Sequence, residues 1–405
     1  MVIVKLYQLA YVMKISVLII LIILVNIFVM TSYVGSYVND QDELELIFKE
    51  AVQGLNIPGA VMLIRSPKGE EFSFVAGVRD IKANPAIAKN YPMTSNLKFR
   101  IGSITKTFVA SVMLMLVQEG IVNLDTTVRE VLPGLVMNDT KITIRHLLQM
   151  RSGLTNFSSD EDFLKRFRAQ SWYVWSPSEL ISYCSASSIG HDSEKISVTG
   201  TGCYTEHDPR PGARFEYNNS NYIVLGMIVE KLTNDKIENQ IYSRILKPLK
   251  LKRTSFPATS SNLSEPYAKG YDYDPATGKI SNLSQRINPS WAWGSANGVS
   301  TAKDLLKWLR AYLDGYGISK KLLAAQMQFT PTSYTGVLYG FGVMNKYGAI
   351  GHNGNYAGIY TTMACKFKGY YFVILTNGQS YGGGRNSSAE SVFWRVVNKA
   401  TLFKN

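Results

Sequence analysis

The sequence predicts an α+β fold, in which helices flank an antiparallel sheet and an all-helical region is inserted between its strands. Three observations predict it. Runs rich in β-branched and aromatic residues, typical of strands, lie near both ends of the chain. Helical spacing of apolar residues dominates from 125 to about 249. Turn residues rather than helices separate neighbouring strand-like runs. We therefore expect sheet segments over about 40–100 and 255–400, and a helical segment over about 101–254, within one region spanning 40–400.

The first part of the chain alternates between helices and a hairpin. Pro58-Gly59 breaks the first helix, and Gly120 ends the second. Between them, Pro67 and Gly69 favour a tight turn between two strands. The expected elements are a helix over 40–53, strands over 60–65 and 71–77, and a helix that begins near Ser103 and ends near 118.

The remaining elements follow the same signals. Ser176 is a favourable N-cap residue and precedes Pro177, which suits the first position of a helix. The segment 185–214 is expected to be a long loop. The expected helices are 144–150, 160–168, 177–184, 221–232, 237–246, 301–313, 320–329 and 387–398. The expected strands are a hairpin near 267–273 and 279–282, and then 338–344, 359–367 and 370–376.

Composition narrows the function classes. The 405-residue chain has a formal net charge of +13 and a pI near 9.4, but no dense run of Lys and Arg and no nucleic-acid motif. We therefore expect no nucleic-acid partner and interpret the charge as a surface that faces an anionic cell envelope. The four histidines and three cysteines show no metal-ligand spacing, so we expect neither a metal nor a cofactor.

The N-terminus has the pattern of a signal peptide or signal anchor over residues 1–36. An almost wholly apolar run from Ile15 to Met30 follows Lys14, and small residues come after it. Met13 would also make a well-formed start, which leaves the true first residue open. We expect an exported protein, periplasmic or extracellular, in which this segment is either cleaved or kept as a membrane tether.

Two cysteines flank a polar stretch within the long loop. In an exported chain, Cys184 and Cys203 are candidates for a disulfide that closes this stretch. The alternative is two unpaired loop thiols. Cys365 lies in an apolar strand-like run and is expected to be a buried small hydrophobic residue.

The Ser-x-x-Lys stretch carries the first chemical signal. Ser103 and Lys106 are three residues apart at the start of an expected helix, which places both side chains on one face. A serine hydroxyl becomes a useful nucleophile when a neighbouring base takes its proton, and a desolvated lysine can act as that base. The helix N-terminus also supplies unpaired N–H groups for an oxyanion. Ser-x-x-Lys alone is a common chance match, so this motif needs support from elsewhere in the chain.

Two further stretches supply that support. Residues 217–219 read Tyr-Asn-Asn and residues 352–354 read His-Asn-Gly. In this order, the three stretches resemble the Ser-x-x-Lys, Tyr-x-Asn and His-x-Gly motifs of the serine β-lactamase and penicillin-recognising family. The resemblance is closest to the branch of class C β-lactamases, D-alanyl-D-alanine carboxypeptidases and esterases. Flanking stretches at 142–148 and 298–305 match as well.

The resemblance implies a fold and a set of roles. The fold is the two-part β-lactamase/transpeptidase type, with the active site between the sheet and the helical region. Ser103 would be the acylated nucleophile and Lys106 its proton partner. Tyr217 would be a second acid/base, and we expect the cationic neighbours Lys106 and His352 to lower its pKa. Asn219 would hold a substrate amide or position Lys106.

The third motif implies further site residues. His352 would support catalysis where many relatives have lysine, and we expect it to titrate near neutrality. Gly354 would let a substrate backbone approach closely. The N–H groups of Ser103 and Asn355 would form the oxyanion hole. A neutral imidazole binds a carboxylate less well than lysine, which predicts weak β-lactamase activity.

These observations favour an exported serine hydrolase with an acyl-enzyme intermediate. The first interpretation is a D-amino-acid-specific peptidase, a carboxypeptidase or a related amidase. An esterase or weak β-lactamase on the same scaffold is the alternative, since small peptides, esters and β-lactams share this chemistry. A silent cell-wall-binding relative is a third reading, and the four intact residues Ser103, Lys106, Tyr217 and His352 argue against it.

Overall fold

The computed structural model describes residues 16–26, 40–81, 91–186, 208–274, 277–379 and 387–404. Cys203 and most of the segment 185–214 lie outside these ranges, so the bond between Cys184 and Cys203 stays a prediction. Of the apolar N-terminal run, residues 16–26 form a helix with exposed side chains. Within the described ranges, no helix has the length and apolar character that a membrane crossing requires.

The sheet has eight antiparallel strands in the order β2-β1-β12-β11-β10-β9-β8-β7. Its strands are β1 (Gly59–Arg65), β2 (Glu71–Gly77), β7 (Thr330–Pro331), β8 (Val337–Tyr339), β9 (Met344–Lys346), β10 (Ala349–Tyr356), β11 (Tyr360–Phe367) and β12 (Tyr370–Thr376). Two small ladders complete the strands: β3 (Phe99–Arg100) with β6 (Val299–Ser300), and β4 (Tyr271–Tyr273) with β5 (Ile280–Asn282). The first and last strands of the chain thus meet at β1 and β12, which confirms the expected fold class.

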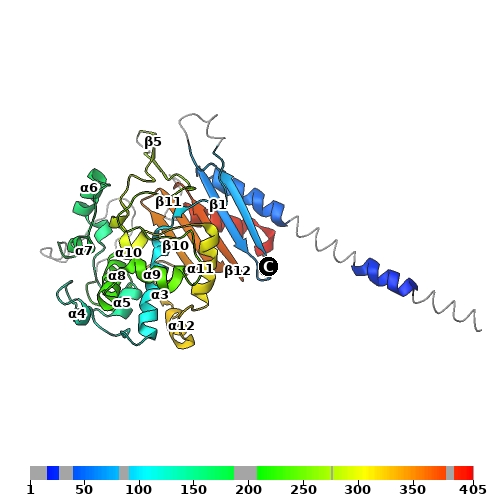
Figure 1. Cartoon of the computed structure of the whole chain (residues 1–405). Coiled ribbons are helices and arrows are strands. Elements are labelled where there is room, and N and C mark those ends of the chain that lie inside the picture. The colour runs from blue at the N-terminus through cyan, green and yellow to red at the C-terminus, as the bar shows by residue number, and fades with distance from the viewer. Residues whose placement is uncertain are drawn as a thin grey trace, which may run out of the picture.

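Helices account for most of the chain between β3 and β4. They are α3 (Thr105–Gln118), α4 (Val128–Val131), α5 (Ile144–Leu148), α6 (Glu161–Ala169), α7 (Pro177–Ala186), α8 (Ser220–Thr233) and α9 (Ile237–Ile241), which continues as a π-helical turn (Tyr242–Leu246). The later helices are α10 (Trp293–Ala296), α11 (Ala302–Leu313), α12 (Lys320–Gln326) and α13 (Ser388–Lys399), and a further helix covers 40–53. Figure 1 shows the strands gathered on one side and α3, α5, α8, α9 and α10 on the other.

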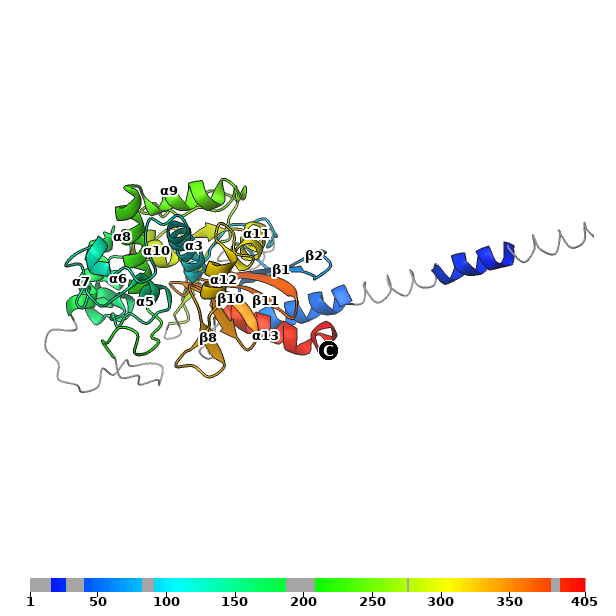
Figure 2. The same cartoon turned by 90° about the horizontal axis from the view of Figure 1, so that it is seen from below.

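Alternation along the strands builds two cores. On β1, Met62 and Ile64 belong to a cluster with helix 40–53 and α13, whereas Val61 and Leu63 face the opposite core. Successive side chains of a strand point to opposite faces, so helices have to cover both sides of the sheet. Helix 40–53 and α13 cover one face, and α11 contacts β1, β11 and β12. Figure 2 shows α13 and α11 on opposite sides of these strands.

The helix that begins after Ser103 is the centre of the second core. Every residue of α3 from Thr105 to Leu116 is buried, which explains why its sequence is apolar on all sides. Helices α8, α9 and α10 pack against it, and β10 contacts the turn just before it. The chain therefore places residues 103–106 where the sheet and the helical layer meet.

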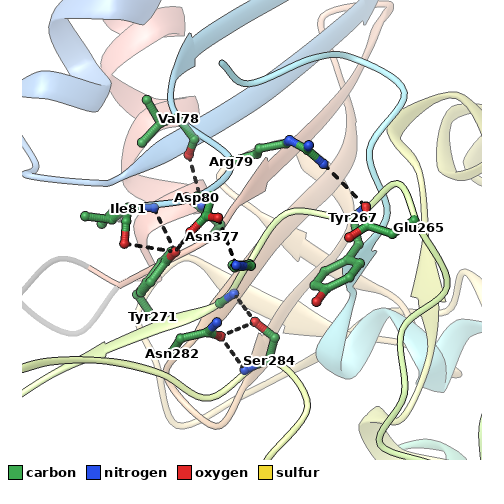
Figure 3. Close-up of polar contacts among 12 residues, drawn as sticks. Val78, Arg79, Asp80, Ile81, Glu265, Tyr267, Tyr271, Asn282, Ser284 and Asn377 are labelled. Carbon is green, nitrogen blue, oxygen red and sulfur yellow. Dashed lines mark hydrogen bonds and ion pairs between the residues drawn. The ribbon is translucent and has the colours of Figure 1, made fainter. Parts of the chain in front are cut away.

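A network of hydrogen bonds connects the small β4–β5 hairpin to the residues that directly follow strands β2 and β12 (Figure 3). The hydroxyl of Tyr271 donates to Asp80 at 2.7 Å and accepts from the backbone N–H of Ile81 at 2.7 Å. The backbone N–H of Tyr271 donates to the carbonyl of Asn377, whose side chain donates to the carbonyl of Val78. The network fixes the segment that follows β12, which reaches the end of β10 through Gln379.

Several expected elements differ at their boundaries. The single strand predicted over 338–344 is two strands, β8 and β9, because the chain turns at Gly340 and Gly342 between them. The elements α4, α10, β3, β6 and β7 had no prediction, and β10 had no predicted bounds because two glycines, Gly351 and Gly354, interrupt its pattern. The first five have two to four residues each, which is too short for a periodic signal.

Candidate active site

Ser103 lies in a 3-10 turn over Gly102–Ile104 that leads directly into α3. We predicted the first turn of a helix, and the position is right although the turn is tighter. The hydroxyl of Thr105 donates to the carbonyl of Gly102 at 2.8 Å and accepts the N–H of Gly298 at 3.0 Å. This serine-bearing turn is therefore held from both sides before any substrate binds.

Lys106 is fully buried beside the serine. Its Nζ lies 3.0 Å from Oγ of Ser103, 2.7 Å from Oδ1 of Asn219 and 3.0 Å from the carbonyl oxygen of Ser295. Burial lowers the pKa of Lys106 well below its ordinary value, because desolvation disfavours the ammonium form. None of its three partners is a carboxylate, so the site favours a neutral amine next to the hydroxyl.

Tyr217 lies across from these two residues. Its hydroxyl is hydrogen-bonded to Ser103, and Nζ of Lys106 lies 5.1 Å from the centre of its ring. Desolvation of the hydroxyl raises the pKa of the phenol well above its ordinary value, although part of the ring stays exposed. Our expectation of a lowered pKa was wrong, because desolvation of the buried phenol raises its pKa more than its neighbours lower it. Tyr217 is thus held as a proton-bearing phenol.

His352 comes from β10 and is 2% exposed. Its Nδ1 lies 2.5 Å from the carbonyl oxygen of Asn353, so this nitrogen carries the proton and Nε2 accepts. The hydroxyl of Tyr339 donates a hydrogen bond to Nε2 over 3.2 Å. Burial lowers the pKa of His352 to about 3. The expected titration near neutrality is therefore wrong, and the imidazole is neutral in the working pH range.

Two glycines bring the Ser103 turn and β10 into backbone contact. A Cβ on Gly102, which has φ of +53°, would lie 2.5 Å from the nitrogen of Asn355. A Cβ on Gly354 would lie 2.1 Å from the carbonyl oxygen of Ile101 and 3.1 Å from the nitrogen of Ser103. The space over Gly354 is filled by protein backbone rather than left open for a substrate. The two nitrogens predicted for the oxyanion hole, of Ser103 and Asn355, thus lie on closely packed facing segments.

Asn219 and Asn355 have distinct settings. The side chain of Asn219 lies between Lys106 and the hydroxyl of Ser158, which accepts from its Nδ2 at 2.8 Å. One N–H of that amide remains for a substrate. Asn355 points outward, and its Nδ2 donates to Gln379 at 2.6 Å. The side chain of Asn355 therefore anchors β10 to the segment after β12, while its backbone faces the serine turn.

Several residues that complete the site had no prediction. Ser295 contributes only a carbonyl oxygen, which no side-chain pattern reveals. Tyr339 contacts His352 from a neighbouring strand pair, and Asn156 and Ser158 contact Asn219. The last two lie shortly after the flanking stretch 142–148 that resembles the family, so their place in the sequence was a usable signal. Among the described residues, no group of three or more His, Cys, Asp and Glu side chains forms a candidate metal site.

Comparison with known proteins places this geometry in a family. The model of a family described as "Beta-lactamase" matches residues 44–393. The chain belongs to the beta-lactamase family. Its fold is that of serine hydrolases of the β-lactamase and penicillin-binding protein group, as the three motifs had indicated.

Curated relatives are distant and longer. Protein flp of Staphylococcus aureus (strain NCTC 8325 / PS 47) is 27% identical over 284 residues, which are 68% of this chain and 49% of that protein. The putative penicillin-binding protein PbpX of Bacillus subtilis (strain 168) is 26% identical over 292 residues, covering 71% of this chain and 63% of that protein. For flp, the match thus spans about half the length of the relative.

Solved structures match over nearly their whole length. A D-stereospecific amidohydrolase from Streptomyces sp. has a TM-score of 0.73 and 26% identity, covering 89% of this chain and 99% of its own. The D-amino acid amidase from Ochrobactrum anthropi SV3 complexed with D-phenylalanine has a TM-score of 0.72 and 24% identity, covering 89% and 98%. The second likeness shows the shared fold.

Proposed function

We propose that the protein hydrolyses amide bonds of D-amino acid derivatives and short D-peptides through an acyl-enzyme on Ser103. The observation that carries the proposal is the contact of the buried Nζ of Lys106 with Oγ of Ser103 at 3.0 Å, in surroundings that favour a neutral amine. The matching amidohydrolase is D-stereospecific by its name, and the amidase with the same fold is named for D-amino acids. Both names support D-amide substrates here.

Acylation follows from the positions of the protons. Lys106 accepts the hydroxyl proton while Oγ of Ser103 attacks the substrate carbonyl, and the oxygen of that carbonyl becomes an oxyanion. The N–H groups of Ser103 and Asn355 stabilise the negative charge. Tyr217 donates its proton to the leaving nitrogen as the C–N bond breaks, and the proton held by Lys106 replaces it through the Ser103 region. The products are an ester on Ser103 and a free amine.

Deacylation reverses the proton path with water as the nucleophile. A water molecule attacks the ester, and its proton passes to the neutral amine of Lys106. The Ser103 oxygen leaves and takes a proton back from Lys106. The site returns to its starting state with a released carboxylic acid, so the cycle needs no metal or cofactor to balance atoms and electrons.

The state of His352 supports a choice among substrates. Its imidazole is neutral and both ring nitrogens are used, Nδ1 by the Asn353 carbonyl and Nε2 by Tyr339. A substrate carboxylate would thus find no cation at the third motif. Amides and esters with uncharged leaving groups are therefore favoured over D-alanyl-D-alanine peptides with a free C-terminus and over penicillins.

A substrate panel tests the proposal. The purified chain is assayed with D- and L-phenylalanine amide, a D-alanyl-D-alanine peptide, a p-nitrophenyl ester and a penicillin. We expect the highest kcat/KM for D-phenylalanine amide and a much lower value for its L-enantiomer. The D-alanyl-D-alanine peptide and the penicillin, which both carry a free carboxylate, should be turned over slowly. Ester turnover without any D-amide turnover would favour the esterase alternative. If the chain hydrolyses none of these substrates and Ser103 is not acylated, the result would favour a silent cell-wall-binding relative.

We also propose that the protein is exported, to the periplasm or the extracellular side, and that its N-terminal apolar segment directs or tethers it. The support is the apolar run behind Lys14 and the net charge of +13, which suits an anionic envelope. Cell fractionation with an antibody against the folded region tests this. Recovery of the full-length chain from the cytoplasm alone would contradict it.

A further inference from the structure

Two polar residues outside the three motifs contact the side chain of Asn219. We propose that Asn156 and Ser158 are positioning residues, which fix the direction of the Asn219 amide and thereby aim the lone pair of Lys106 at Ser103. The inference rests on the proposed acyl-enzyme function. It adds the hydrogen bonds that orient the amine of Lys106, so that its lone pair can accept the proton of Ser103.

The donor and acceptor roles in this chain of hydrogen bonds are set by a backbone N–H group, which can only donate. The backbone N–H of Asn219 donates to Oδ1 of Asn156 at 3.1 Å, so that atom of Asn156 is an acceptor. The hydroxyl of Ser158 therefore donates to the same Oδ1 at 3.0 Å. Having spent its one proton, Ser158 can only accept, and Nδ2 of Asn219 donates to it at 2.8 Å. Nδ2 of Asn156 is separately anchored, since it donates to Ser159 at 3.0 Å.

The same direction continues to the base. With Nδ2 of Asn219 facing Ser158, its Oδ1 must face Lys106, where it accepts at 2.7 Å. The carbonyl of Ser295 is the second pure acceptor, at 3.0 Å. A neutral amine has two N–H groups, and these two acceptors use both. The remaining lone pair faces the third neighbour, Oγ of Ser103 at 3.0 Å, which is the atom that must lose its proton.

The titratable groups around Lys106 are neutral and do not impose a different orientation on its amine. Its titratable neighbours are Tyr217 and Tyr222, with ring centres 5.1 Å and 5.6 Å from Nζ, and His352 on β10. The two phenols hold their protons because burial raises the pKa of each, and the histidine is neutral. The remaining packed elements contribute the neutral groups of Asn219 and Ser295. Proton direction at Lys106 is therefore set by hydrogen bonds rather than by a counter-charge.

Reversal of the Asn219 amide would disable the base. Its NH2 group would then face Lys106, disfavour the ammonium form and attract the lone pair away from Ser103. Its oxygen would face Ser158, whose single proton cannot serve both that oxygen and Oδ1 of Asn156. In the wild type this mismatch keeps the amide in the productive direction.

The test measures the rate at which a fluorophosphonate probe labels Ser103 as a function of pH, a readout independent of the substrate class. In Ser158→Ala the amide is free to reverse, so we expect labelling to fall by about ten- to a hundredfold and its acid limb to move to lower pH. Asn219→Asp should move the same limb to higher pH, because a carboxylate stabilises the ammonium form. Ser158→Thr keeps the hydroxyl and should restore the wild-type profile. Ser243→Ala is the control, because this serine is exposed and its hydroxyl donates to the carbonyl of Asn239, outside the network, so the variant should behave as wild type.

The outcomes separate this inference from the proposed function. Opposite shifts in Ser158→Ala and Asn219→Asp, with rescue by Ser158→Thr, support the positioning role even if no D-amide is hydrolysed. A uniform loss of rate in Ser158→Ala, with the acid limb unmoved, would overturn it and indicate a merely structural serine. An unlabelled Ser103 in the folded wild type would overturn the proposed function and this inference together.

Discussion

The hydroxyl of Tyr339 donates to Nε2 of His352 over 3.2 Å, on the side of the ring opposite its bond to a backbone carbonyl. The third-motif histidine is thereby held in one tautomer, with no free nitrogen. It acts through its shape and hydrogen bonds rather than through a charge.

His352 should make the protein sensitive to acid. Its folded pKa of about 3 lies below the ordinary value of 6.5, so the unfolded chain binds more protons between these values. The stability it contributes is complete above pH 6.5 and is lost as pH falls toward 3, at up to about 1.4 kcal/mol per pH unit. Urea unfolding at several pH values measures this slope. His352→Gln should reduce it, and the half-buried His146→Gln should reduce it less. An acid limb near pH 6.5 that disappears in His352→Gln would contradict this assignment.

Ser103 and Lys106 should behave as one catalytic unit. Ser103→Ala should abolish acylation, and Lys106→Ala should cost nearly as much because the hydroxyl loses the amine that accepts its proton. The double variant should be little worse than either single variant, since the losses of a unit do not add. Tyr217→Phe should lower turnover by about 10²–10⁴-fold. Intact-mass analysis after a slow acyl donor, followed by peptide mapping, measures the acylation. A label on another serine would exclude this site.

Gly102 should be intolerant of any side chain. Gly102→Ala adds a left-handed alanine, which costs roughly 1–2 kcal/mol, and a Cβ that would lie 2.5 Å from the nitrogen of Asn355. We expect β10 to shift away from the serine turn and kcat to fall by about 10²-fold. Gly120→Ala is the matched control, with φ of +73° and open space around its Cβ. It should lose stability alone, and equal losses of kcat in the two variants would refute the role of the contact.

Glu390 should stabilise the third motif from the far face of the sheet. The carboxylate is 1% exposed, accepts from the side chain of Asn353 at 2.9 Å and from Trp394 at 3.2 Å, and forms an ion pair with Lys346. Glu390→Ala should destabilise the fold by about 3–5 kcal/mol, because it removes the ion-pair partner of a largely buried lysine and the acceptor of two partly buried N–H groups. Adding Lys346→Met should recover part of that loss.

Denaturant unfolding of these variants measures the coupling. The exposed pair of Lys49 and Glu45 supplies the control, since breaking it should change stability by no more than about 0.5 kcal/mol. Additive effects of the Glu390 and Lys346 substitutions would mean that the two side chains do not interact.

Local patterns predicted much of the fold. The strands β2 and β12 and the helix over 40–53 have the predicted bounds, because each has a clear period and a turn or cap at its end. Thr301, expected as the first residue of a helix, is the N-cap of α11 instead. Short pieces such as α10 were missed because their conformation depends on tertiary packing. The residues that the three motifs singled out, namely Ser103, Lys106, Tyr217 and His352, lie close together in the structure, as the resemblance implied.

The electrostatic state of the site was the part that sequence could not supply. A tyrosine and a histidine beside a lysine suggest mutual charge effects, yet burial dominates each pKa here. How deeply a side chain is buried depends on residues distant in sequence, such as Tyr339 and Ser295. A backbone carbonyl as a partner of Lys106 leaves no mark in the sequence at all.

The pairing of β1 with β12, in which Ala60 lies opposite Thr376, has a consequence for the chain during its synthesis. The proposed nucleophile Ser103 and its base Lys106 belong to an early segment. Strand β10, which carries the other half of the proposed oxyanion hole, is made much later and pairs with β11, which in turn pairs with β12. A growing chain thus carries a serine that cannot yet work. Because such long-range pairing forms slowly, the enzyme stays inert until its last strands have been made, and a chain cut before β12 would carry the motifs without the activity.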